Sequence, residues 1–194
     1  MFTFEAETLL KYADLAMYQA KAVGGNAFRF FTANMTEHAQ RFAAIEKDLR
    51  QSIKENQCRL HYQPVFDLKT NLICGAEALV RWQHPDHGLM LPNEFIPIAE
   101  ETGFINELGR WVIGEATKKT VKWRSKDTQS PIKVAVNVSS RQFWGDFDTG
   151  FVRDLLAEAD FPADRLIIEI TESLVMGEES GIIRILEELR ELGV

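Results

Sequence analysis

Residues 73–82 read Ile-Cys-Gly-Ala-Glu-Ala-Leu-Val-Arg-Trp, an apolar run that carries one acid and one arginine. Such a run is typical of a buried β-strand. Because residues two apart on a strand share a face, Glu77, Leu79 and Arg81 point the same way. A carboxylate and a guanidinium on a buried strand need partners or a function. A structural ion pair, an exposed sheet face and a catalytic site all fit this pattern, and the strand alone leaves them open.

The composition is that of a globular protein. The 194 residues are 45% apolar and 26% charged, and the formal net charge is -7. These values exclude a disordered chain and indicate no basic surface for nucleic acid or an anionic membrane. Cys58 and Cys74 form no metal or disulfide motif, which indicates reduced thiols in a cytoplasmic protein. We find no signal peptide and no apolar run long enough to span a bilayer.

Strands alternate with helices over most of the chain. A turn at residues 69–71 predicts that the first two strands form an antiparallel hairpin. The expected elements are strand 59–68, strand 73–82, helix 92–101, helix 106–124, strand 132–139, helix 150–159, strand 165–172 and helix 180–192. This alternation predicts βα units, a parallel sheet and the α/β fold class.

The N-terminal segment has a simpler pattern. We expect a helix over residues 8–22, a short strand over 28–31 and a longer connecting helix from 36 to about 56. One helix and one strand cannot bury both of their faces. This segment is therefore either docked on the rest of the chain or part of a larger domain.

Three of the expected strands each carry a polar residue suited to a hard metal ion. These residues are Glu77, Asn137 and Glu169, and Glu172 follows the last strand. An oxygen-only set favours Mg²⁺ or Mn²⁺ over zinc, and in a (β/α) barrel such groups meet at the C-terminal ends of the strands. Arg81 could bind a phosphate through its planar fork. Metal-assisted phosphoester chemistry is one interpretation; in the other, Asn137 and Glu169 only satisfy local loops.

Several motifs in a fixed order resemble one known family. They are Tyr62-Gln63-Pro64, Glu77 to Trp82, His84-Pro85, Phe95-Ile96-Pro97, Ala99-Glu100-Glu101, Val136 to Ser139 and Glu169 to Ser173. Together they resemble the EAL domain, a family of phosphodiesterases that open cyclic di-GMP to linear pGpG on a TIM-type barrel. The resemblance covers residues 41–194 and implies bacterial second-messenger signalling. It implies cyclic di-GMP as the ligand, allows a homodimer through this domain and suggests no nucleic-acid partner.

The resemblance also implies roles for six residues. It assigns metal ligation to Glu77, Asn137 and Glu169, ordering of the loop near the metal to Glu172, contact with a substrate phosphate to Arg81, and a place in the substrate pocket to Gln63. A pair of Mg²⁺ or Mn²⁺ ions in such a site would polarise the phosphoryl oxygens and generate hydroxide from a bound water.

The motifs of the family continue beyond Val194, with an Asp-Asp-Phe-Gly-Thr-Gly motif and a lysine-bearing strand. A TIM-type barrel needs about 250 residues. The sequence therefore predicts a partial barrel whose catalytic set is incomplete, and a chain that is inactive alone. Two alternatives stay open: a non-catalytic EAL module that binds cyclic di-GMP or a signalling partner, and a degenerate gene fragment.

The N-terminal segment resembles a second family. Residues 13–21, followed by Gly25 and Asn26, resemble the closing helix and strand of a GGDEF (diguanylate cyclase) domain. The nucleotide-binding residues of that family are not in this stretch, so cyclase activity is not implied. The expected domains are a GGDEF remnant over residues 1–33, a linker helix over 34–57 and the N-terminal part of an EAL domain over 58–194.

Overall fold

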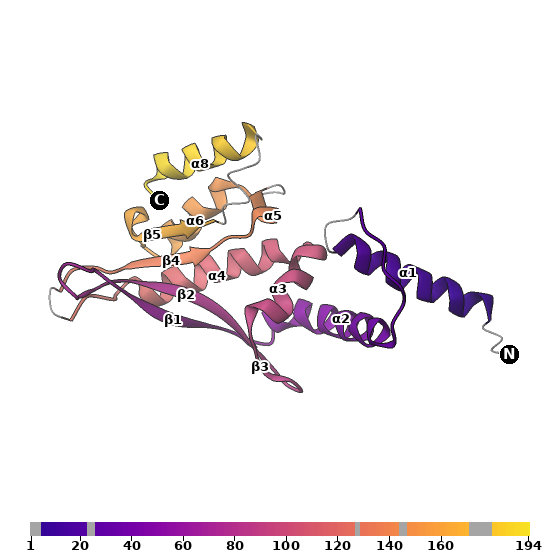
Figure 1. Ribbon diagram of the computed structural model, residues 1–194. Helices are drawn as coiled ribbons and strands as arrows, with labels where there is room; N and C mark the ends of the chain where they lie inside the picture. The colour runs from indigo at the N-terminus through magenta and orange to yellow at the C-terminus, as the bar shows by residue number, and fades with distance from the viewer. Residues whose placement is uncertain (1–4, 23–25, 127–128, 144–146, 171–179) are drawn as a thin grey trace. The chain divides into compact units, whose positions relative to one another are not determined.

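The computed structural model describes residues 5–22, 26–126, 129–143, 147–170 and 180–194 (Figure 1). The chain divides into two compact units, Met1–Asp48 and Leu49–Val194. The division falls within helix α2 (Ala33–Ser52), which corresponds to the expected linker helix.

The first unit contains helix α1 (Ala6–Ala22) and the first part of α2. Tyr12 of α1 stacks on Phe31, and their ring centroids are 3.8 Å apart. The strand that we expected over residues 28–31 is not formed, because this segment has no regular secondary structure. A strand needs a neighbour to satisfy its backbone groups, and within the described residues no strand pairs with this segment.

The second unit is built on one sheet. Its strands are β1 (Cys58–Phe66), β2 (Ile73–His84), β3 (Gly88–Met90), β4 (Lys133–Asn137) and β5 (Leu166–Glu169). The strand order is β1-β2-β4-β5, and the short β3 pairs with β2 (Figure 1). Strands β1 and β2 form the expected antiparallel hairpin, whereas β2, β4 and β5 run parallel. The predicted parallel sheet is therefore confirmed.

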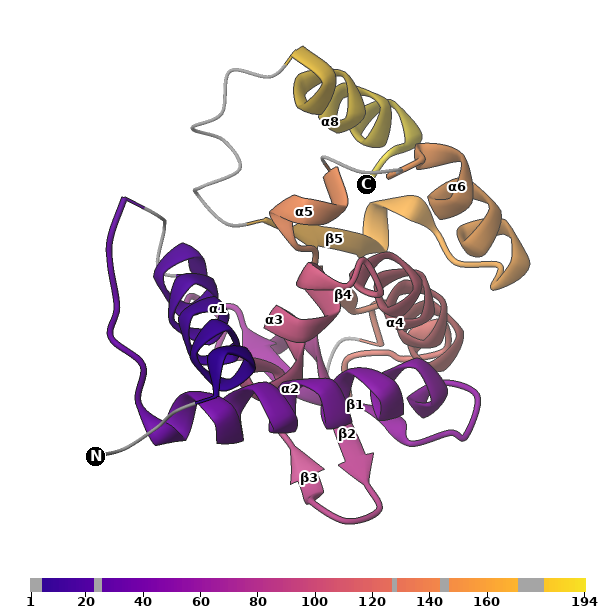
Figure 2. The same cartoon turned by 90° about the vertical axis from the view of Figure 1, so that its right-hand side faces the viewer.

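Helices cover one face of this sheet. The helices of the unit are α3 (Pro92–Glu101), α4 (Ile105–Thr120), the short α5 (Ser140–Phe143), α6 (Thr149–Glu158), the 3₁₀ turn η1 (Ala163–Arg165) and α8 (Ser180–Leu192). Helix α4 contacts β1, β2 and β4, and α6 lies between α4 and α8 (Figure 2). The side of α4 turned inward is apolar, with Leu108, Val112, Ile113 and Ala116 buried.

The two faces of β2 differ as the alternation of its residues predicts. Ala76, Ala78 and Trp82 are buried, and the Trp82 ring packs edge-on against Phe95 at a centroid distance of 5.8 Å. On the other face, Glu77 and Arg81 are only half-buried. One face therefore builds the hydrophobic core, and the other presents polar side chains.

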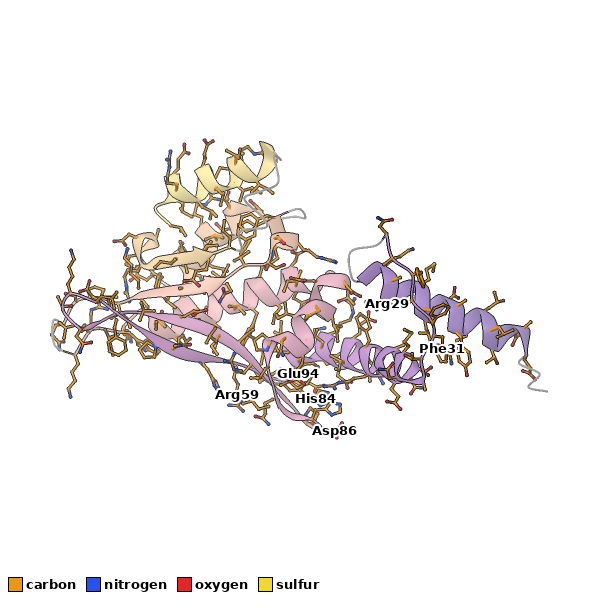
Figure 3. The ribbon with its side chains drawn as sticks, viewed as in Figure 1. Arg29, Phe31, Arg59, His84, Asp86 and Glu94 are labelled. Carbon is orange, nitrogen blue, oxygen red and sulfur yellow. The ribbon has the colours of Figure 1, made fainter. Side chains whose placement is uncertain are left out.

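The β2–β3 turn is closed by a buried histidine. His84 accepts hydrogen bonds at Nδ1 from the backbone N–H groups of Asp86, at 3.1 Å, and His87, at 3.3 Å (Figure 3). The two accepted bonds hold the imidazole against the backbone of the turn. His84 therefore has a structural role in this turn.

Helix α4 ends four residues earlier than expected because of a contact from a distant part of the chain. Arg165, which lies just before β5, is only 6% exposed. It donates to the carbonyl of Thr120 at 3.0 Å, of Val121 at 2.8 Å and of Ile132 at 3.0 Å. One side chain thus satisfies the carboxyl end of α4 and joins it to the segments that lead into β4 and β5.

Candidate functional site

Three polar residues on neighbouring parallel strands lie together at one edge of the sheet. Asn137 and Glu169 end β4 and β5 and are direct partners in the strand register. Glu77 on β2 pairs with Ala135, two residues before Asn137. The amide of Asn137 donates from Nδ2 to Oε1 of Glu77 at 2.7 Å. The structure therefore brings together Glu77, Asn137 and Glu169, the three residues that the sequence suggested as metal ligands.

The carboxylate groups of Glu77 and Glu169 repel each other. The pKa of Glu169 is raised, first by burial of its carboxyl group and second by the nearby charge of Glu77. A carboxyl group whose ionisation is disfavoured by a neighbouring carboxylate is stabilised in its charged form by a cation beside it. Within the described residues, no three His, Cys, Asp or Glu side chains form a metal-binding group. The two carboxylates and the Asn137 amide together supply the oxygen donors that suit a hard divalent ion.

The expected substrate-binding residues lie beside this cluster. Gln63 of β1 is the direct register partner of Glu77, and its side chain is exposed. Arg81 lies four residues after Glu77 on the same face of β2, and its Nη1 donates to the carbonyl of Val80 at 2.7 Å. Glu172, expected to order the loop near the metal, lies outside the described residues.

A second arginine that the sequence did not single out joins this face. Arg59 of β1 is the direct register partner of Arg81, and Figure 3 shows it near the end of the hairpin where β3 joins. Two like charges opposite each other on a sheet cost stability. The register therefore places two cationic residues on the same face of the sheet as Glu77, four residues further along β2, in a position that suits an anionic group. Only the register of the hairpin could have revealed it.

The chain that leaves β4 is held by three residues to which the sequence analysis gave no individual role. Ser139 donates its hydroxyl to Oε1 of Glu100, on α3, at 2.5 Å. The backbone N–H of Ser139 donates to Oε1 of Gln142 at 2.9 Å. The pattern Ser-x-x-Gln is the signature of a capping box at the start of a helix, so residues 139–142 carried a recognisable signal.

A cavity of about 410 Å³ adjoins the cluster. It lies among α3, α4 and the ends of β2, β4 and β5, and its walls are mainly apolar. The polar residues in its lining are Asn93, Glu100, Asn137, Ser139, Gln142 and Glu169. An apolar hollow with a few convergent polar groups is the usual form of a ligand site.

Comparison with known proteins identifies the family. The model of the EAL domain matches residues 46–194. The chain belongs to the EAL domain family. The bifunctional diguanylate cyclase/cyclic di-GMP phosphodiesterase MucR of Pseudomonas aeruginosa is 39% identical over 186 residues, which are 96% of this chain and 27% of MucR. The oxygen sensor protein DosP of Escherichia coli is 37% identical over 186 residues, which are 96% of this chain and 23% of DosP. The chain thus spans about a quarter of the length of these relatives.

Solved EAL structures have the same fold. The MucR phosphodiesterase in complex with c-di-GMP is 38% identical, with a TM-score of 0.72, over 78% of this chain and 61% of that one. The EAL enzyme Bd1971, bound to cAMP and cyclic di-GMP, is 27% identical, with a TM-score of 0.71, over 98% of this chain and 50% of that one. These EAL neighbours and the parallel sheet confirm the predicted α/β fold of a partial TIM-type barrel.

The EAL phosphodiesterases are a metal-dependent family, and structural neighbours of this chain bind cyclic di-GMP. The acidic cluster and the two cationic residues on the same face suit both facts. In the described part of the chain, no helix has the length and apolarity needed to cross a membrane.

Proposed function

We propose that this chain contributes the first strands of a cyclic di-GMP phosphodiesterase site, which hydrolyses cyclic di-GMP to pGpG. One observation carries the proposal: the 2.7 Å hydrogen bond from Asn137 to Glu77, with Glu169 in register beside Asn137. It places three oxygen-bearing side chains of three parallel strands toward their C-terminal ends, where barrel enzymes hold their reacting groups. The cyclic di-GMP complexes of the structural neighbours support the substrate.

Glu77, Asn137 and Glu169 would hold Mg²⁺ or Mn²⁺ through their oxygen atoms. Such an ion would polarise a phosphoryl oxygen and lower the pKa of a bound water. The protein residues hold its position: β4 and β5 fix Asn137 and Glu169 side by side, and the Asn137 amide orients the Glu77 carboxylate. Glu172 would order the loop above this position, as the resemblance to the family implies.

Arg81, with Arg59 opposite, would bind a phosphate of the dinucleotide, and Gln63 would line its pocket. A planar guanidinium fork matches two phosphate oxygens, and two such groups balance the charge of a dinucleotide diester better than one. The exposed position of Gln63, the register partner of Glu77, supports this place for Gln63 in the pocket.

The proposal extends to the organisation of the parent protein. Residues 1–33 would be the end of a GGDEF domain, residues 34–57 a linker helix and residues 58–194 the EAL part. Support comes from MucR, whose name combines a diguanylate cyclase with a phosphodiesterase and whose match covers 96% of this chain. A cytoplasmic location fits the free thiols of Cys58 and Cys74. A homodimer through the EAL part would follow from the family resemblance.

The test is a hydrolysis assay with cyclic di-GMP and Mn²⁺ that follows pGpG. We expect no product from the 194-residue chain alone and product from a version extended through the full EAL domain. Glu77→Gln in the extended version should reduce the rate by at least about 100-fold, because it removes the ligand charge. Tight binding of cyclic di-GMP without hydrolysis by the extended protein would instead indicate the non-catalytic module.

A further inference from the structure

The segment after Asn137 is fixed by its own side chains. Strand β4 ends at Asn137, and α5 begins three residues later. Ser139 precedes α5, and its Oγ accepts from the N–H of Arg141 at 3.2 Å. Gln142 reaches back and accepts from the N–H of Ser139 at 2.9 Å. This capping box sets the path of the backbone two residues after the proposed metal ligand.

The side chain of Gln142 lies in a notch in α4, which is the space left by the absent Cβ atom of Gly109. Gln142 is 3% exposed, and its amide lies against Gly109. A Cβ atom at Gly109 would overlap Nε2 of Gln142 and stand 3.1 Å from its Cδ. Any residue larger than glycine at this position must therefore displace the Gln142 amide.

A second contact anchors the same segment from α3. Glu100 accepts the Ser139 hydroxyl at 2.5 Å, and its backbone carbonyl accepts from Nη1 of Arg141 at 3.3 Å. The side chain of Asn137, in contrast, is exposed, and its amide donates a hydrogen bond to Glu77 on a neighbouring strand. The backbone after Asn137 is held at Val138, whose N–H donates to the carbonyl of Glu169 at 2.9 Å, and at Ser139, whose N–H donates to Gln142.

We propose that Gln142, seated in the notch at Gly109, is a positioning residue for Asn137. It holds the Ser139 amide, which fixes the end of β4 and keeps the Asn137 amide aimed at Glu77. This inference rests on the proposed function, because it takes Asn137 as a metal ligand. Residues that orient metal ligands in this way typically change metal affinity about 10- to 100-fold when they are removed.

The test uses two glycines of the same helix. Gly109→Ala displaces Gln142 without altering any residue of the cluster. Gly114→Ala is the matched control, because its new Cβ would meet only the flexible end of Leu155, at 3.3 Å from Cδ2. The readouts are Mn²⁺ affinity, by electron paramagnetic resonance on the version extended through the full EAL domain, and hydrogen exchange of the Ser139 amide in the 194-residue chain without metal. Gly109→Ala should weaken Mn²⁺ binding about 10-fold and speed Ser139 exchange, whereas Gly114→Ala should change neither.

A double-mutant cycle separates this mechanism from general destabilisation. Gln142→Ala should weaken Mn²⁺ binding as Gly109→Ala does, and Gly109→Ala should have no further effect once the Gln142 amide is absent. Additive effects, or unchanged Mn²⁺ affinity in Gly109→Ala, would overturn the inference and leave the proposed function standing. An extended version with the wild-type residues that binds no Mn²⁺ would overturn both the proposed metal site and the inference.

Discussion

Replacing Arg165 by methionine should lower the free energy of unfolding of the second unit by about 3 kcal/mol. The guanidinium makes three hydrogen bonds of 3.0 Å or less to carbonyls at the end of α4 and before β4. Hydrogen bonds from a charged donor contribute about 1.5 kcal/mol each at the low end of their range. Methionine keeps the apolar volume of the stem and avoids the burial of a charge, which offsets part of this loss.

The measurement is urea denaturation followed by tryptophan fluorescence. Arg124→Met is the matched control, because Arg124 donates to the carbonyls of Val121 and Trp123 from an exposed position. Exposed hydrogen bonds of this kind compete with water, so the control should change stability by less than about 0.5 kcal/mol. If Arg165→Met and Arg124→Met shift the urea midpoint equally, the view that Arg165 joins α4 to the sheet is refuted.

Two further predictions concern the cysteines and a residue of the core. Cys74 is exposed and should react with iodoacetamide in the folded chain, whereas burial raises the pKa of the Cys58 thiol and should protect it. Because a raised pKa leaves less thiolate at a given pH, Cys58 should stay largely unlabelled at pH values from about 7 to about 9; mass spectrometry of the alkylated peptides checks this, and equal labelling of Cys58 and Cys74 would contradict the structure. Trp82→Phe should lower the free energy of unfolding by about 1 to 2 kcal/mol, since it removes the 2.9 Å hydrogen bond from Nε1 to Gln57 and part of a fully buried ring. Thermal unfolding measures this loss, and an unchanged midpoint would argue against burial of the indole.

Element boundaries were predictable where local signals set them. Helix α3 has the expected bounds, because Pro92 suits the first turn of a helix and Gly103, with a φ of 74°, follows its end. Helix α8 likewise ends before Gly193, whose φ is 98°. The end of α4 was placed four residues too late, because the contact that ends it comes from Arg165, which is remote in the sequence. Pairing with a distant strand also decides whether residues 28–31 form a strand, and no local pattern reports it.

For the candidate site, the sequence predicted on which strands and faces the residues lie, but not how their side chains are oriented. The alternation of β2 placed Glu77 and Arg81 on one face, and the order of the strands placed Asn137 and Glu169 at one edge. The orientation of these side chains was not predictable, because it depends on contacts such as that of Gln142 with Gly109. Such a contact joins two helices whose relative position exists only in the folded chain.

The reversed direction of β1 has a mechanical consequence. Because β1 is antiparallel to β2, its first residue, Cys58, is the register partner of Trp82, near the end of β2. Helix α2 therefore delivers the chain to the same edge of the sheet that holds the acidic cluster. The Ser52 hydroxyl of α2, 3.2 Å from Sγ of Cys58, ties the helix to this point. A force applied at the end of α2 near Ser52 would reach this edge of the sheet first, whereas with a parallel first strand it would reach the opposite edge.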